Sequence, residues 1–301
     1  MAKKFLALAQ TGENKWWRYF LGILIILVSW QVIGAIPFII LVVLLQNDQS
    51  PETKLNSQTL QFEGVDPLLQ YLVLNFSFVC FLIGLYITVC FIHHRNFITL
   101  ITPQNKVNRY RVIQGIGVWI FIVALFSLID CYFISVGNYK LTFNLSKFLI
   151  FLPIALILTP VQASVEELFF RGYLMQGIGL KTRKPTISIL VTSLLFMLFH
   201  LLNPEVKTGI LILAFYYFSV AVFLAVITIK ENSLELAIGV HIGNNLFNVL
   251  FVSYSNSALS APSIFTIQNF DPISNLISSF LFCLLFYLFF FIKTTREIVS
   301  R

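Results

Sequence analysis

The sequence predicts an all-α fold: a polytopic membrane helix bundle of about eight transmembrane helices, with both termini in the cytoplasm. Of its 301 residues, 58% are hydrophobic and only 11% are charged, whereas soluble domains carry about 25% charged residues. The apolar residues are gathered in runs that reach the ~20 residues a membrane-spanning helix needs. Lys and Arg gather in alternate connections between these runs, as they do in cytoplasmic loops of membrane proteins.

Three apolar runs lie in residues 1–145, which we interpret as three N-terminal transmembrane helices. The predicted helices are 20–46, 68–92 and 110–136. Four basic residues precede the first helix, and four acidic residues with a single lysine lie in the connection 47–67. The connection 93–111 is basic again. This alternation places the N-terminus and the connection 93–111 on the cytoplasmic side.

Residues 146–255 hold four further apolar runs and most of the ionisable residues inside apolar sequence. The predicted helices are 147–165, 187–203, 209–229 and 233–253. The first of them should be kinked at Pro160 and continue through the amphipathic stretch 161–180. Residues 256–301 complete the chain with a last transmembrane helix, 274–292, and a basic cytoplasmic tail.

The composition also excludes several classes of protein. The net charge of +7 comes from residues at the ends of apolar runs, so it fits membrane topology rather than nucleic-acid binding, and we expect no nucleic-acid partner. The four cysteines are scattered without metal-ligand spacing. No cleavable signal peptide is expected. The chain is therefore predicted to be a multi-pass integral membrane protein, and its compact length favours a bacterial plasma membrane.

Ionisable side chains inside a membrane are costly and are candidates for function. Glu167 and Arg171 are four residues apart, so they can pair on one helix face. Glu166 points about 100° away and is left without that partner. Two adjacent carboxylates in such apolar sequence are more than one salt bridge requires, and a desolvated glutamate is suited to act as a general base or acid.

Two later helices supply further polar groups at a similar depth. His200 ends a strongly apolar run, and His241 and Asn245 lie one turn apart on one helix face. Counted at 1.5 Å per residue from the nearest basic anchor, Glu166, His200 and Asn245 lie about 22, 24 and 22 Å deep, and His241 about 16 Å. We therefore expect these groups to share one cavity inside the membrane.

The residue types in this cavity allow two kinds of chemistry. A Glu and a His on facing helices can hold and deprotonate a water, while a second His and an Asn donate hydrogen bonds to an oxyanion, as amide hydrolysis requires. Glu166, His200 and His241 could instead bind a divalent metal such as zinc with an open position for water. The sequence contains neither an HExxH zinc motif nor a Gly-x-Ser-x-Gly nucleophile motif.

These motifs resemble the signature of the CAAX-protease and bacteriocin-processing (CPBP/Abi) family, which includes the CAAX prenyl protease type 2 enzymes. The motifs are, in chain order, Glu166-Glu167-x-x-x-Arg171, Phe196-x-x-x-His200 and His241-x-x-x-Asn245. The resemblance covers about residues 150–255. It implies an eight-helix intramembrane endopeptidase in which Glu166 and His200 activate water and His241 and Asn245 stabilise the oxyanion.

The resemblance further implies that Glu167 pairs with Arg171 and holds the helix in register. Members of the family have been described both as metalloproteases and as metal-free glutamate proteases; we favour the metal-free mechanism, with no cofactor.

The expected partners are the lipid bilayer and a peptide or protein substrate, prenylated or otherwise apolar. Two alternatives stay open: a catalytically silent binding or immunity scaffold with the same fold, and a proton-coupled transporter. We expect the cavity to open toward the cytoplasm or sideways into lipid.

Overall fold

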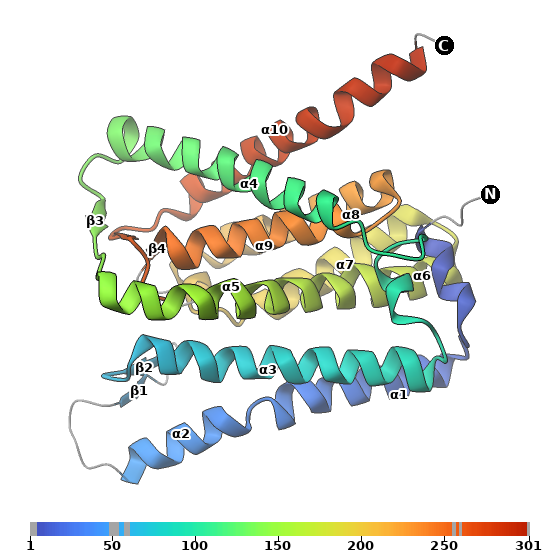
Figure 1. The fold of residues 1–301 in the computed structure, drawn as a ribbon, viewed down its shortest axis with the longest axis horizontal. Helices are drawn as coiled ribbons and strands as arrows, with labels where there is room; N and C mark the ends of the chain where they lie inside the picture. Colours follow the sequence, from blue (N-terminus) through green and yellow to red (C-terminus); the bar gives the residue numbers. More distant parts are fainter. Residues whose placement is uncertain (1–4, 48–53, 57–60, 255–256, 259–260, 300–301) are drawn as a thin grey trace.

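Long helices that run roughly alongside one another make up the protein (Figure 1). The computed structural model describes residues 5–47, 54–56, 61–254, 257–258 and 261–299. In this part of the chain, six helical stretches are long and apolar enough to cross a membrane: Trp16–Leu45, Pro67–Ile92, Arg109–Ile134, Leu145–Thr182, Ile210–Glu231 and Pro272–Ile292. The multi-pass helical fold is therefore confirmed. The count of eight stays a prediction, because two further helices, α7 (Pro185–His200) and α9 (Glu235–Leu250), have only 16 residues each.

The N-terminal half follows the predicted runs, with short irregular turns added to them. Its elements are η1 (Phe5–Thr11), α1 (Trp16–Leu27), η2 (Val28–Ile33), α2 (Ile36–Asn47), β1 (Lys54–Asn56), β2 (Gln61–Glu63), α3 (Pro67–Ile87), η3 (Thr88–Ile92), η4 (Phe97–Leu100), α4 (Arg109–Ile129) and η5 (Asp130–Ile134). Local chemistry sets the helix starts. The side chain of Asp66 accepts the backbone N–H of Leu68 at 2.7 Å, and Pro67 occupies the first position of α3.

The C-terminal half contains all the helices that carry motif residues. Its elements are β3 (Tyr139–Leu141), α5 (Leu145–Glu167), η6 (Leu168–Leu174), α6 (Met175–Thr182), α7, η7 (Pro204–Thr208), α8 (Ile210–Glu231), α9, β4 (Val252–Tyr254), β5 (Phe265–Ile267) and α10 (Pro272–Val299). Arg183 and Asn232 adopt left-handed backbone conformations and end α6 and α8. Helix α5 runs through Pro160, and the wide π-type turn η6 follows it, so the predicted long fourth helix is present.

Helix α9 lies at the centre of the bundle, against α4 and α5 (Figure 1). It is buried on nearly every side, including its polar residues. Two glycines let α4 and α9 approach closely: a Cβ on Gly239 would lie 2.4 Å from the carbonyl oxygen of Val112, and one on Gly115 would lie 2.9 Å from that of Leu236. The polar face of α9 is thereby fixed inside the protein.

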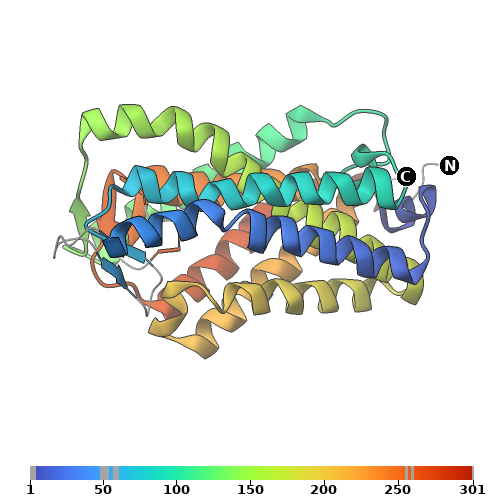
Figure 2. The same ribbon diagram turned by 90° about the horizontal axis from the view of Figure 1, so that it is seen from below.

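Short strands, which the sequence did not predict, close one end of the bundle. Strands β1 and β2 pair antiparallel, and β3, β5 and β4 form a three-stranded sheet in that order. They lie at the end opposite to η1 and to the C-terminal end of α10 (Figures 1 and 2). Both ends of the described chain thus share the basic end of the bundle, and their cytoplasmic location stays a prediction.

Candidate active site

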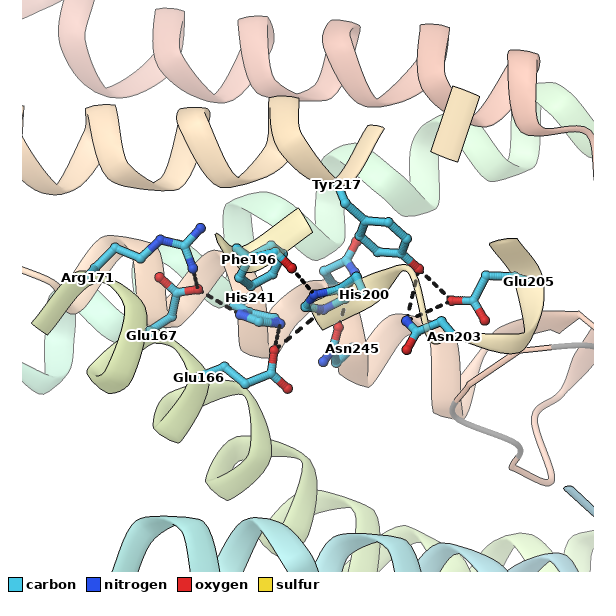
Figure 3. A network of polar contacts seen from close by, with 11 residues as sticks. Glu166, Glu167, Arg171, Phe196, His200, Asn203, Glu205, Tyr217, His241 and Asn245 are labelled. Carbon is cyan, nitrogen blue, oxygen red and sulfur yellow. Dashed lines mark hydrogen bonds and ion pairs between the residues drawn. The ribbon is translucent and has the colours of Figure 1, made fainter. Parts of the chain in front are cut away.

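The two adjacent glutamates at the end of α5 face different neighbours (Figure 3). Glu167 is completely buried and accepts a hydrogen bond from Arg171 Nη1 at 2.7 Å. Arg171 also donates from Nη2 to the carbonyl oxygen of Ala221 in α8, at 3.1 Å, and its guanidinium lies over the ring of Phe196. Because both members of the pair are buried, the charge of Glu167 is neutralised without help from water. The predicted pairing is present.

Glu166 points away from this ion pair and toward two imidazole rings (Figure 3). Its Oε2 is 3.7 Å from Nε2 of His200 and 3.8 Å from Nε2 of His241. Within the described residues this buried oxygen has no hydrogen-bond partner. Both distances are too long for direct hydrogen bonds, but they are short enough for one small reacting group to contact the carboxylate and a ring together.

The imidazole of His200 is oriented by its own helix. Its Nδ1 lies 2.8 Å from the carbonyl oxygen of Phe196, and the two rings stack with centroids 4.0 Å apart. A carbonyl oxygen can only accept, so Nδ1 carries the proton and Nε2 presents a lone pair toward Glu166. The side chain is 18% exposed, so it is the most accessible of the grouped ionisable residues.

Helix α9 supplies the second histidine and the asparagine. His241 Nδ1 lies 2.8 Å from Oε1 of Glu167, the same oxygen that accepts from Arg171. Asn245 is buried one turn further along, and its Oδ1 accepts from Asn244 at 3.2 Å. That bond leaves the amide N–H groups of Asn245 as its remaining polar atoms. The structure therefore brings together the motif residues that the sequence predicted to share a cavity.

These residues line one cavity of about 290 Å³. Glu166, His200, His241 and Asn245 are all in its wall. The remaining polar lining residues come largely from the strand end of the bundle: Asn203, Glu205, Tyr217, Asn248, Tyr254, Ser257 and Asn275. The cavity thus extends toward the end with few basic residues, and its opening toward the cytoplasm or sideways into lipid stays a prediction.

A second polar cluster in this wall was missed by the sequence analysis. Glu205, in η7, is buried and accepts hydrogen bonds from the Tyr217 hydroxyl at 2.5 Å and from Asn203 Nδ2 at 3.2 Å. Burial raises the pKa of Glu205 above its ordinary value, and the bond from Tyr217 opposes that shift. The loop after α7 contains Asn203, Pro204 and Glu205, which by composition is typical of an exposed turn, so no sequence signal distinguished this carboxylate.

Two adjacent histidines at the end of η3, His93 and His94, have different surroundings. His94 is exposed, but His93 is buried, with Nδ1 2.7 Å from the carbonyl oxygen of Glu13 and Nε2 3.0 Å from the Tyr173 hydroxyl. Burial lowers the pKa of His93. The histidine therefore joins the N-terminal segment to η6 and lies outside the cavity lining.

The three side chains that could bind a metal ion are Glu166, His200 and His241. A zinc site needs three or four ligand atoms converging at about 2.0–2.3 Å from the ion. In the described part of the chain, no group of three His, Cys, Asp or Glu side chains is arranged closely enough to hold a metal ion. The arrangement of Glu166, His200 and His241 therefore does not fit a metal centre without rearrangement.

Comparisons with known proteins find two similarities. Residues 145–247 match the family described as type II CAAX prenyl endopeptidase Rce1-like. The chain is also similar to the uncharacterized protein YyaK of Bacillus subtilis, at 33% identity over 268 residues, which covers 87% of this chain and 86% of the relative. No solved structure matches the chain. The family match includes every residue of the cavity motifs, from Glu166 to Asn245.

Proposed function

Because the chain belongs to the Rce1-like family of type II CAAX prenyl endopeptidases, we propose that it is an intramembrane endopeptidase that hydrolyses a peptide bond of a membrane-associated substrate. The observation that carries this proposal is the position of Glu166: a buried carboxylate oxygen without a hydrogen-bond partner in the described chain, facing Nε2 of two histidines at 3.7 and 3.8 Å. Glu167 also has one buried oxygen without such a partner, but its other oxygen holds Arg171 and His241, and only Glu166 lines the cavity.

In the proposed reaction, Glu166 and His200 position and activate the attacking water. The water donates one hydrogen to Glu166 and the other to Nε2 of His200, which has a lone pair because Nδ1–H is bonded to Phe196. Its oxygen attacks the peptide carbonyl carbon while Glu166 takes the proton. When the carbon–nitrogen bond breaks, Glu166 returns that proton to the leaving amine, so the carboxylate is regenerated.

His241 and Asn245 are proposed to stabilise the oxyanion of the tetrahedral intermediate. Since Nδ1–H of His241 is donated to Glu167, the ring can donate from Nε2 only when it is doubly protonated. The Glu167 carboxylate next to the ring favours that charged form, and Asn245 adds an amide N–H. In this mechanism Glu167 and Arg171 hold His241 in orientation and do not contact the substrate.

The proposed mechanism needs no metal or other cofactor, and none of its steps depends on one. If zinc were the cofactor instead, Glu166, His200 and His241 would be its ligands, and both rings would have to be neutral at Nε2. The two mechanisms therefore differ in the charge of His241. The metal-free one predicts that activity survives dialysis against a strong chelator.

We propose a bacterial plasma membrane as the location and an apolar or lipid-modified peptide as the substrate. A cavity lined by aromatic rings such as Phe196 and Phe199 and by amides such as Gln162 and Asn248 offers contacts to both apolar groups and peptide backbone. The expected partners are thus a peptide or protein substrate, prenylated or otherwise apolar, and the surrounding lipid.

The first experiment compares the wild-type protein with Glu166→Gln and His200→Ala in cells, by quantitative proteomics of peptide termini in the membrane fraction. Glu235→Gln is the matched control, because Glu235 is also a buried carboxylate on this bundle but bonds the backbone of Asn108 outside the cavity. We expect the same set of termini to disappear in both active-site variants and to persist in the control.

Losing general acid–base catalysis typically lowers a rate by about 10²- to 10⁴-fold, enough to remove these termini. Identical termini in all four strains, with equal protein levels, would contradict proteolysis. That result would favour the binding or immunity scaffold, since such a role does not need Glu166 ionised. Proton-coupled flux in lipid vesicles would indicate a transporter instead.

A further inference from the structure

The polar cluster at the strand end of the cavity is formed by Asn203, Glu205, Tyr217 and the backbone of Ala258; we call it the Glu205 cluster. Oε1 of Glu205 accepts from Tyr217 at 2.5 Å and from Asn203 at 3.2 Å, and Oε2 accepts the backbone N–H of Ala258 at 3.0 Å. Asn203 Nδ2 also lies 3.1 Å from the Tyr217 hydroxyl. The cluster joins three elements: η7, α8 and the segment after β4.

This cluster is closed rather than open to a ligand. Glu205 is 3% exposed, and both of its oxygens already accept hydrogen bonds from the protein. A carboxylate with this many donors has little capacity left for a substrate cation. Its effect on the cavity must therefore pass through the side chains that it holds.

The side chain held most directly is Tyr217, and Tyr217 contacts His200. Their ring centroids are 4.6 Å apart, with an interplanar angle of 37°. On its other side the imidazole stacks on Phe196 at 4.0 Å. His200 is thus clamped between two aromatic rings, one from its own helix and one from α8 (Figure 3).

His200 needs such a clamp more than the other catalytic candidates do. It is the last residue of α7, whereas Glu166 is followed by the helical turn η6 and His241 lies inside α9. Helix ends fray, and their final residues lack the support of a following turn. The chain after His200 turns at once into η7, which carries Glu205.

From these contacts we infer that Glu205 and Tyr217 are positioning residues: they hold the imidazole of His200 against Phe196 with Nε2 directed at Glu166. The inference rests on the proposed function, since it assigns His200 to the water-activating pair. Glu205 fixes the Tyr217 hydroxyl, the Tyr217 ring covers the second face of His200, and His200 faces the reacting centre. Neither positioning residue contacts the reacting atoms.

The test uses the purified full-length chain in detergent, with Tyr217→Phe and Glu205→Gln. Tyr173→Phe is the matched control, because it removes another buried tyrosine hydrogen bond, to His93, outside the cavity. The probe is an internally quenched peptide that ends in a farnesylated CAAX sequence. We expect both cluster variants to lower kcat by about 10- to 100-fold, as misplaced catalytic groups do, with KM changed by less than about two-fold.

A second measurement does not depend on turnover. Diethyl pyrocarbonate acylates unprotonated imidazole nitrogens. Mass spectrometry of peptides then gives the extent of acylation at each of the four histidines of the chain. We expect Tyr217→Phe and Glu205→Gln to change the acylation rate of His200 several-fold while that of exposed His94 stays the same. If Tyr173→Phe alters His200 equally, the cluster has only a general structural role.

The two measurements decide the inference together. A fall in kcat without altered His200 acylation, or altered acylation without a fall in kcat, would overturn it. Wild-type protein that cleaves none of the probe would count against the proposed function on this substrate class. The acylation rates would then still show whether Glu205 and Tyr217 hold His200.

Discussion

The two histidines of the cavity are held in contrasting ways. His241 lies inside α9 and bonds Glu167, which is completely buried and paired with Arg171. His200 ends α7, is partly exposed, and is held between Phe196 and Tyr217 beside the Glu205 cluster. One ring therefore depends on buried ionic contacts, and the other on aromatic stacking next to a polar turn.

The difference follows from the charge each ring is proposed to carry. A doubly protonated His241 needs a carboxylate next to it, and Arg171 forms a buried ion pair with that carboxylate. A neutral His200 needs only a fixed tautomer and a fixed ring plane, which a carbonyl oxygen and two aromatic faces provide. The two supports are thus matched to two different roles in one reaction.

The largest effect is expected from breaking the buried Glu167–Arg171 ion pair that supports His241. Arg171→Met should lower the free energy of unfolding by about 3–5 kcal/mol, because it breaks a buried ion pair and leaves His241 alone to balance the charge of Glu167. The double variant Glu167→Gln/Arg171→Met should recover much of that loss. Thermal unfolding in detergent measures both. Equal destabilisation by the single and double variants would show that lost packing, rather than the unpaired charge, is responsible.

The next largest effect is expected from weakening the aromatic contact between Tyr217 and His200. Tyr217→Phe should lower activity by about 10-fold or more in the wild-type background, but should have no further effect in a His200→Ala background. The effects of two substitutions are not additive when one residue acts through the other. The measurement is cleavage of the farnesylated probe by the four proteins of this cycle. A Tyr217→Phe loss that persists without His200 would mean that Tyr217 acts by another route.

The smallest expected effect is a change with pH in the folding stability that Glu205 contributes. Burial raises the folded-state pKa of Glu205 above its ordinary 4.5. As pH rises from that value, the unfolded chain ionises first, so the fold loses stability until the buried carboxyl ionises as well. The groups facing it, Tyr217, Tyr254 and Asn203, stay neutral over this range.

We therefore expect the melting temperature of the wild type, relative to Glu205→Gln, to fall by about 2 °C as pH rises through this window. Thermal unfolding of both proteins at a series of pH values measures the difference. Parallel curves would show that Glu205 does not titrate differently in the folded state. Aspartate is too short to preserve the bonds, so glutamine is the informative substitution.

The ionic half of the site could be predicted from sequence, and the aromatic half could not. Glu167 and Arg171 are four residues apart, as are His241 and Asn245, and helical periodicity alone places each pair on one face. Tyr217 is 17 positions after His200, on a different helix. Its contact with His200 depends on how α8 crosses α7. Neither helical periodicity nor a residue's depth in the membrane reveals that crossing.

The same distinction holds for the rest of the molecule. Hydropathy predicted the positions of the long helices, because a lipid environment demands continuous apolar runs. It did not predict the strands β3, β4 and β5, whose three-residue segments pair only because α5, α9 and α10 bring them together. Nor did it predict the burial of His93, since this depends on the N-terminal segment folding back onto η3 and η6.

By itself, the sequence determined that this chain is a helical membrane protein and which polar side chains share one depth, because both follow from local composition and the 1.5 Å helical rise. The tertiary structure alone decided which groups meet: the approach of Glu166 to His241, the lone pair of His200 facing Glu166, and the burial of Glu205 beside Tyr217. These depend on how helices cross and rotate against one another, and that is set by packing among residues far apart in the chain.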